Sequence, residues 1–266
     1  MTEERVLKIM PRVCEHYEEA LKYFPEDRIV GIFLHGSQNY KLETDSSDVD
    51  TKLIVVPTFR DIAMNLKPVS TTHVRENEEH IDFKDVRLYL QTFRKQNLNF
   101  LEILFTDFAI INPKYKSYWE VLRHYRESIA HYHHDRGLKS MKGVAMEKYH
   151  ALKHPYPSKL ELLEKYGYDG KQLHHLVRIE EFIKRFLDGE PYADCLITKQ
   201  PDYLKALKAN ILPLAHAEEL AAATIENVET MVDRALNGEP ANERIDALLD
   251  EIQYQIMEEA IRSELK

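Results

Sequence analysis

Two short apolar runs separated by a polar loop constrain this chain more than any other feature of its sequence. The first run, 29–34, ends in a Gly-Ser turn at 36–37, and the second, 52–56, follows Asp-Val-Asp at 48–50. Apolar runs of this length, bounded by turn residues, are typical of buried strands. The sequence therefore predicts two strands, one of which delivers a Gly-Ser turn while the other begins with paired aspartates.

The residue types at these two points suit phosphate and metal chemistry. Gly36 lets backbone N–H groups approach a phosphate without a side chain in the way, and Ser37 adds a small hydroxyl donor. Because side chains alternate along a strand, Asp48 and Asp50 should lie on one face. Two carboxylates on one rigid face suit Mg²⁺, which prefers hard oxygen ligands and substrate phosphates.

Each motif also has a simpler interpretation. A Gly-Ser pair alone is a turn, and an isolated Asp-x-Asp is usually a solvated loop or the start of a helix. The combination is more specific: a strand, Gly-Ser, a polar loop, Asp-x-Asp and a second apolar strand follow one another. This order favours a catalytic role for Asp48 and Asp50.

Composition narrows the class of protein. The chain has 266 residues and a formal net charge of −9, which argues against binding nucleic acid by bulk charge alone. Its two cysteines, Cys14 and Cys195, give no disulfide framework, so we expect a reducing, cytoplasmic location. No apolar run approaches the ~20 residues that cross a bilayer, and the acidic start at 1–5 is unlike a secretory signal.

Hydrophobic periodicity predicts an α+β domain at 1–112 followed by an all-helical domain at 113–266, divided at Asn112-Pro113. The first domain should hold a small mixed sheet. Its expected strands are 28–34, 51–56, 69–75 and 80–83, and its expected helices are 6–23, 59–66, 84–96 and 100–105. The expected helices of the second domain are 118–130, 136–152, 158–166, 170–187, 202–235 and 241–265.

A second cluster of polar residues lies on the expected helix 170–187. Lys171, Arg178 and either His174 or His175 are spaced by three, four and seven residues, so they share one helix face. Spacing alone is equally consistent with a solvent-facing stripe and packed histidines. It does not decide which of the two histidines joins the cationic face.

The Gly-Ser and Asp-x-Asp pair resembles the signature of the polymerase-β-type nucleotidyltransferase superfamily. The resemblance implies a palm-like sheet, two bound Mg²⁺ ions (or Mn²⁺), an NTP held at Gly36 and Ser37, and pyrophosphate release. It also implies a third carboxylate, for which Asp82 is the candidate ligand and helper in deprotonating the acceptor. Glu79 and Asp85 lie close by and leave that assignment open.

The passage from Gly167 to Arg178 resembles a pattern in one branch of this superfamily, the predicted nucleotidyltransferases associated with RNA repair. That resemblance implies binding of ATP or another NTP and an RNA or tRNA end as acceptor. It implies that Lys171, His174 and Arg178 bind the triphosphate or an acceptor phosphate. The chain departs from the expected pattern at Lys41, where a glycine is expected.

Two other functions remain open from the sequence. The acceptor of the nucleotide could be a protein or a small molecule, and an acidic surface suits a cationic acceptor better than RNA. Alternatively, the chain could be a catalytically quiet nucleotide-binding or partner-binding module, for instance an antitoxin. The clustered acids favour an active transferase, because clustered charges are costly to keep without a use.

Overall fold

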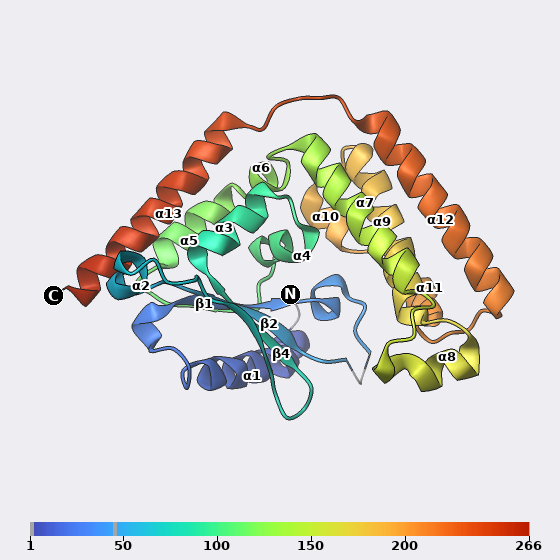
Figure 1. Cartoon of the computed structure of the whole chain (residues 1–266), viewed down its shortest axis with the longest axis horizontal. Helices are drawn as coiled ribbons and strands as arrows, with labels where there is room; N and C mark the ends of the chain where they lie inside the picture. The colour runs from blue at the N-terminus through green and yellow to red at the C-terminus, as the bar shows by residue number, and fades with distance from the viewer. Residues whose placement is uncertain (1–2, 45–46, 266) are drawn as a thin grey trace. The chain divides into compact units, whose positions relative to one another are not determined.

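The computed structural model describes residues 3–44 and 47–265, and these residues form two compact units (Figure 1). The first unit takes the described residues up to Asn39, from Glu43 to His133, and from Ala241 on. The second takes Tyr40–Leu42 and His134–Pro240. Contacts thus group residues 113–133 and the last helix with the sheet, whereas the sequence predicts a division at residue 112.

A five-stranded mixed sheet is the centre of the first unit. Its strands are β1 (Ile29–His35), β2 (Asp50–Val55), β3 (Ser70–Val74), β4 (His80–Asp85) and β5 (Ala109–Ile111). Their order is β3-β4-β2-β1-β5, with β2 and β4 parallel and every other pair antiparallel. The sequence predicted four of these strands. It missed β5, which pairs with the free side of β1 next to the expected break at residue 112.

Helices surround this sheet. Those of the first unit are α1 (Glu3–Ala20), η1 (Glu26–Arg28), α2 (Phe59–Ala63), α3 (Val86–Arg94), α4 (Leu98–Leu101), η3 (Glu102–Leu104), α5 (Lys116–His124), α6 (Arg126–Ala130) and α13 (Glu243–Glu264). The short helix η2 (Ser37–Tyr40) follows β1. The capping box between Thr58 and Asp61 starts α2 where the sequence predicts it. Helix α13 packs on α3 and α5, which explains why it belongs with the sheet.

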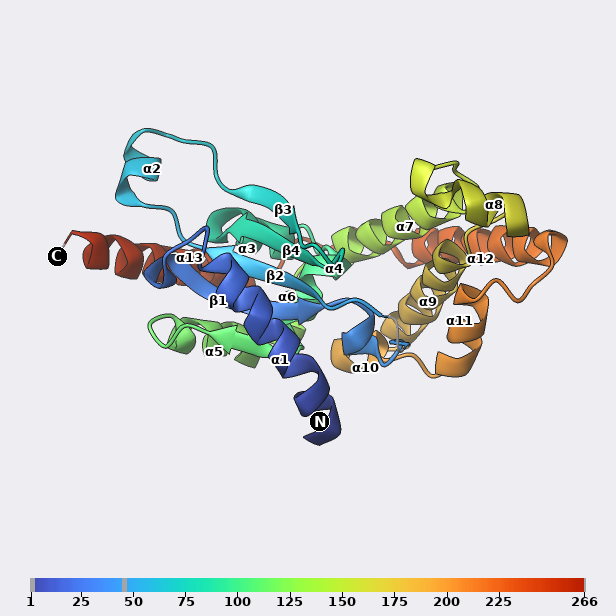
Figure 2. The same cartoon turned by 90° about the horizontal axis from the view of Figure 1, so that it is seen from below.

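The two faces of the sheet carry different side chains. Helix α1 lies along one face, whereas α3 and α5 lie on the other (Figures 1 and 2). On the α1 face, Leu53 of β2 joins a buried apolar cluster with Ile9 and Val13 of α1. On the opposite face, the Phe33 ring packs on Trp119 of α5, with 4.2 Å between the ring centres. Alternation along β2 therefore separates an apolar face from the face that carries Asp50 and Lys52.

The second unit is helical. It contains α7 (His134–Ala151), η4 (Pro157–Lys159), α8 (Leu160–Tyr166), α9 (Gly170–Leu187), α10 (Tyr192–Leu196), α11 (Pro201–Lys208) and α12 (Leu214–Ala235). Helix α9 is its centre, because it packs against α7, α10, α11 and α12. The expected single helix 202–235 is two helices, and α10 was not expected. Gly167 ends α8 with a φ of 80°, a left-handed conformation that favours glycine.

The expected α+β class is confirmed, since a mixed sheet early in the chain is followed by a helical region. Within the described part of the chain, no helix has both the length and the apolar character needed to span a bilayer.

Truncating Leu53 to alanine should destabilise the first unit by about 2–5 kcal/mol, because it opens a cavity in the cluster beneath α1. The single tryptophan, Trp119, packs on the same sheet, so its fluorescence in a denaturant titration reports the unfolding of this unit. The exposed Leu66→Ala variant is the control and should stay within about 0.5 kcal/mol of wild type. Equal losses in both variants would contradict this core.

Candidate functional site

The turn after β1 is fixed by its backbone and by a distant carboxylate. Gly36 has a φ of 89°, in the left-handed region that L side chains avoid, although a Cβ there would meet no neighbour. The Gly36 N–H donates to Glu102 Oε1 at 2.9 Å, and the Gly36 carbonyl accepts from the Asn39 N–H at 2.9 Å. Glycine is thus required here for its conformation. Its N–H is engaged by a carboxylate rather than presented to a phosphate.

Glu102 is a residue of this turn that the sequence analysis missed. It is only 2% exposed, and the same oxygen that accepts from Gly36 lies 3.4 Å from His35 Nδ1. A buried carboxylate is costly unless donors surround it. The only sequence signal was an acid set within the apolar stretch 100–105, which by itself indicates an amphipathic helix.

Asp48 and Asp50 lie where the sequence predicts, at the start of β2. Asp48 is exposed and precedes the strand, whereas Asp50 is its first residue and is half-buried. The backbone N–H of His80 donates to Asp50 Oδ1 at 2.9 Å, and His80 Nδ1 lies 3.2 Å from the same oxygen. In the antiparallel register Asp50 is the partner of His35, directly before the Gly-Ser turn. The turn and the acids therefore meet at one edge of the sheet.

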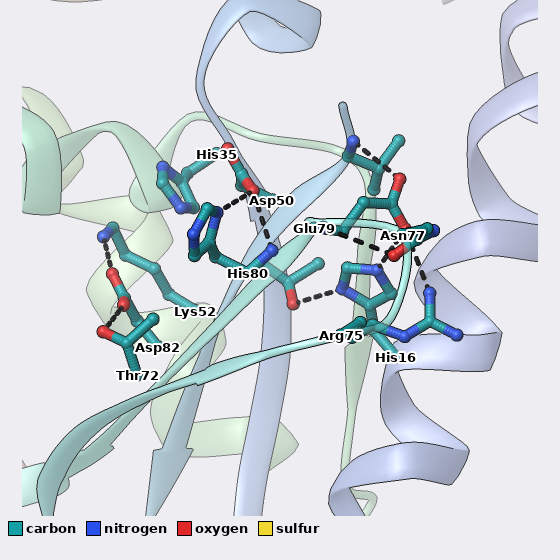
Figure 3. Close-up of polar contacts among 12 residues, drawn as sticks. His16, His35, Asp50, Lys52, Thr72, Arg75, Asn77, Glu79, His80 and Asp82 are labelled. Carbon is teal, nitrogen blue, oxygen red and sulfur yellow. Dashed lines mark hydrogen bonds and ion pairs between the residues drawn. The ribbon is translucent and has the colours of Figure 1, made fainter. Parts of the chain in front are cut away.

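Asp82 lies on the same face as Asp50 but is engaged by other side chains (Figure 3). Lys52 Nζ donates to one carboxylate oxygen at 2.9 Å, and the Thr72 hydroxyl donates to the other at 2.6 Å. Burial alone would raise the pKa of Asp82, but the Lys52 ammonium and the Thr72 hydroxyl outweigh it and lower that pKa. Asp82 is the ion-pair partner of Lys52.

The parallel register explains this placement. Lys52 is the register partner of Asp82, so Asp50 is level with His80. Asp82 follows His80 by two residues on β4. Its side chain is therefore on the same face as that of His80 but about 6.6 Å further along the strand. The third carboxylate implied by the family resemblance is replaced at that point by an imidazole.

The donor set fits a metal ion only in part. Across residues 3–44 and 47–265, no three or more His, Cys, Asp or Glu side chains are grouped so that they could hold a metal ion. Mg²⁺ commonly takes one or two carboxylates and completes its shell with water and substrate phosphates. Asp48 and Asp50 fit such a site, whereas Asp82, held by Lys52 and Thr72, does not fit as a third ligand.

The two acids next to Asp82 in sequence do not replace it. Asp85 is buried, accepts from the Arg87 backbone N–H at 2.9 Å and pairs with the Arg87 guanidinium, so it caps α3. Glu79 is also buried, and it contacts α1 on the opposite face of the sheet from Asp50. Neither carboxylate faces Asp50.

In the second unit, the structure gives the cationic residues of α9 different surroundings. Lys171 is exposed, and its backbone N–H donates to the Asp169 side chain that caps the helix. The Arg178 guanidinium lies over the Tyr40 ring at 4.1 Å from its centre. Cation–π contact of this kind fixes an arginine while leaving its charge in place. The predicted role of Lys171 and Arg178 in binding triphosphate stays a prediction.

His174 is placed in the interior of the second unit. It is 3% exposed, and its Nδ1 donates to the Leu204 carbonyl at 2.8 Å. Burial lowers the pKa of His174 to about 4, and Arg178 adds to this shift, while the bond to Leu204 opposes it. A neutral, buried imidazole does not suit the predicted role in binding phosphate, so His174 packs the core of this unit.

Comparisons with known proteins give little further information. No protein-family model matches the chain, and no curated protein matches it. Among solved structures, the chain is similar to a nucleotidyltransferase-like protein from Exiguobacterium sibiricum. The two share 15% identity over 85% of this chain and 75% of that one, with a TM-score of 0.30. A likeness of this size carries no argument about activity.

The burial of His174 predicts how the stability of the second unit depends on pH. The unfolded chain binds a proton here below its ordinary pKa of 6.5, whereas the folded chain does so only below about 4. The contribution of His174 is therefore complete above pH 6.5 and is lost as the pH falls from 6.5 to 4. Between pH 7 and 4.5, wild type should lose on the order of 2 kcal/mol more unfolding free energy than His174→Gln.

Urea unfolding followed by far-UV circular dichroism at the two pH values measures this difference. His216→Gln, an exposed histidine of α12, is the matched control and should lose as much stability as wild type. Identical pH profiles for wild type and His174→Gln would show that the imidazole is not buried in neutral form.

Proposed function

We propose that this protein is a nucleotidyltransferase that moves a nucleoside monophosphate from an NTP to an acceptor hydroxyl and releases pyrophosphate. The observation that carries the proposal is the register of β1 and β2. It brings the Gly36-Ser37 turn and the acids Asp48 and Asp50 to one edge of one sheet. A polar turn beside two carboxylates at a strand end is an arrangement that suits a metal-bound triphosphate.

In this proposal Asp48 and Asp50 hold Mg²⁺ that arrives with the NTP. When bound, the ion neutralises phosphate charge and favours in-line displacement at phosphorus. The chain's own contribution is positioning. Ser37 offers a hydroxyl to a phosphate oxygen, and the left-handed Gly36 turns the backbone so that Ser37 follows directly. His80 holds the Asp50 carboxylate oxygen through its N–H.

A hollow lined by Asp82, on the same face of the sheet as Asp50, supports a nucleic-acid acceptor. It lies beside β3, β4 and α4, and Thr72, Asp82, Lys84 and Phe100 are among the residues that line it. The ammonium groups of Lys52 and Lys84 lie 4.4 and 5.0 Å from the centre of the Phe100 ring. An aromatic ring flanked by cations is a common way to receive a base and its phosphate. We therefore favour an RNA end over a cationic small molecule as the acceptor.

Two observations favour the alternative, a quiet nucleotide-binding module. The Gly36 N–H is engaged by Glu102, and the described side chains offer two rather than three carboxylates for metal. A module of this kind would bind NTP without transferring it. Transfer assays and binding assays on the same preparation separate the two functions.

Replacing Asp48 and Asp50 together by asparagine should reduce nucleotide transfer by roughly a thousandfold, because the metal loses its protein carboxylates. The assay supplies Mg²⁺, each α-³²P-labelled NTP in turn, and total cellular RNA or protein extract as acceptor. Asp107→Asn, an exposed acid paired with Arg123, is the control and should keep wild-type transfer. Label on a protein band would show that the acceptor is a protein rather than RNA. NTP binding without label in any acceptor would establish the quiet module.

A double-mutant cycle tests whether Asp82 acts as the partner of Lys52. Asp82→Asn leaves the buried Lys52 ammonium unpaired and should cost on the order of 2 kcal/mol of unfolding free energy. Adding Lys52→Met removes the unpaired charge, so the double variant should regain most of the lost stability. A double variant as unstable as Asp82→Asn would show that the two side chains do not stabilise the fold as a pair.

A further inference from the structure

Glu79, on the face of the sheet that is turned away from the acids, is bonded by an unusual number of donors (Figure 3). It is only 1% exposed. One carboxylate oxygen accepts from His16 Nε2 at 2.9 Å, Arg75 Nη1 at 3.0 Å and Asn77 Nδ2 at 2.8 Å. The other oxygen contacts the Arg12 guanidinium and accepts from the Val49 backbone N–H at 2.9 Å.

The bond to Val49 connects this buried group with the candidate site, because Val49 separates Asp48 from Asp50. Hydrogen bonds to an ionised carboxylate are short and about twice as strong as neutral ones. A buried carboxylate also has no water with which to exchange its donors. The Val49 N–H is therefore held firmly, and with it the peptide group that joins Asp48 to Val49.

A second connection runs through His16. A carboxylate oxygen only accepts, so the His16 bond to Glu79 uses the Nε2–H, and Nδ1 is left to accept from the Thr51 hydroxyl at 2.9 Å. Burial lowers the pKa of His16 to about 4, and Arg75 adds to that shift. The imidazole is thus neutral near pH 7, as this pair of bonds requires. Thr51 follows Asp50 directly, so both chain neighbours of Asp50 are held.

Arg12 of α1 makes the third connection. Its Nη1 donates to the Ser47 carbonyl at 3.4 Å, while its Nη2 contacts Glu79. Residues 47, 49 and 51 are thereby all held from the α1 side. Because side chains alternate along a strand, Asp50, which lies between Val49 and Thr51, points to the other face.

We propose that Glu79, together with His16, is the positioning group of the two acids, fixing the backbone of residues 47–51 from behind the sheet. The inference rests on the proposed function, in which Asp48 and Asp50 hold the metal. It assigns Glu79 no contact with substrate or metal. Its effect is transmitted through the Val49 N–H and the Thr51 hydroxyl, so it alters the separation and the order of the two carboxylates.

Three variants test this proposal. Glu79→Ala removes every bond of the carboxylate, Glu79→Gln keeps an oxygen that can accept from the Val49 N–H, and Thr51→Val cuts only the connection through His16. The matched control is Asp85→Asn, which alters another buried, arginine-paired carboxylate, at the last residue of β4, that contacts neither acid. If Glu79→Ala fails to fold, Glu79→Gln and Thr51→Val carry the test.

The first readout does not depend on catalysis. Amide hydrogen exchange at Val49, followed by NMR, should become at least about tenfold faster in Glu79→Ala and stay near wild type in Glu79→Gln. Binding of Mn²⁺ in the presence of a non-hydrolysable NTP analogue, measured by electron paramagnetic resonance, should weaken roughly tenfold in Glu79→Ala and Thr51→Val. Asp85→Asn should change neither quantity.

The second readout is transfer itself. A displacement of the acids of about 1 Å should lower kcat by roughly a hundredfold while the KM for NTP changes little. Faster Val49 exchange with Mn²⁺ binding equal to that of Asp85→Asn would reduce Glu79 to a structural role and overturn the proposal. So would unchanged exchange in Glu79→Ala. If wild type itself transfers nothing, the proposed function fails, but the Mn²⁺ comparison still decides whether Glu79 positions the acids.

Discussion

The two-residue period of β2 determines on which face of the sheet Asp50 and Lys52 lie. Its side chains alternate between an apolar cluster under α1 and a polar face that carries Asp50 and Lys52. A shift of one residue in register would turn Asp50 and Lys52 into the apolar cluster and remove Leu53 from it, so the register is strongly fixed. The burial of apolar side chains such as Leu53 thus sets the direction of Asp50, although Leu53 lies three residues away and on the other face.

Two buried carboxylates then fix the backbone of the Gly-Ser turn and of the Asp-Val-Asp segment more closely than the alternation along β2 does. Glu79 and Glu102 are each almost fully buried, and each accepts a backbone N–H from one half of the motif. Water cannot reach such groups to replace a lost donor, so distortion of the loop would leave a charge without a partner. An exposed acid in the same place would exchange its donors with solvent. Burial therefore keeps the Gly36 and Val49 N–H groups in fixed positions relative to Glu102 and Glu79.

The sequence predicted the local features of this site but not the partners across the sheet. Apolar runs and turn residues were enough to locate β1, β2 and the Gly-Ser turn, because those signals lie within a few residues of each other. Asp82 was expected beside Asp50, yet the parallel register of β2 with β4 places His80 there. Register depends on the packing of both strands, and no local pattern encodes it.

The role of Glu79 could not be predicted from the sequence either. The sequence shows it at the end of an acidic turn, 76–79, which is ordinarily solvated. Its donors come from Arg12 and His16, more than sixty positions earlier, as well as from the nearby Arg75. Helix α1 has to pack on the sheet before these cations reach the turn. His174 was misplaced for a related reason, since helical spacing identifies a face without showing whether that face is buried.

The state of Gly36 bears on how a triphosphate could be held. A phosphate and the Glu102 carboxylate would compete for the Gly36 N–H, and their like charges repel strongly where water is excluded. In the proposed function, phosphate contact at this turn would therefore fall to the Ser37 hydroxyl and to a metal ion held by Asp48 and Asp50. Gly36 contributes its left-handed backbone instead, which ends β1 and starts η2 at the same point. Glycine is thus required by the shape of the turn, and in the proposed function the phosphate would be bound by the groups that the turn places around it.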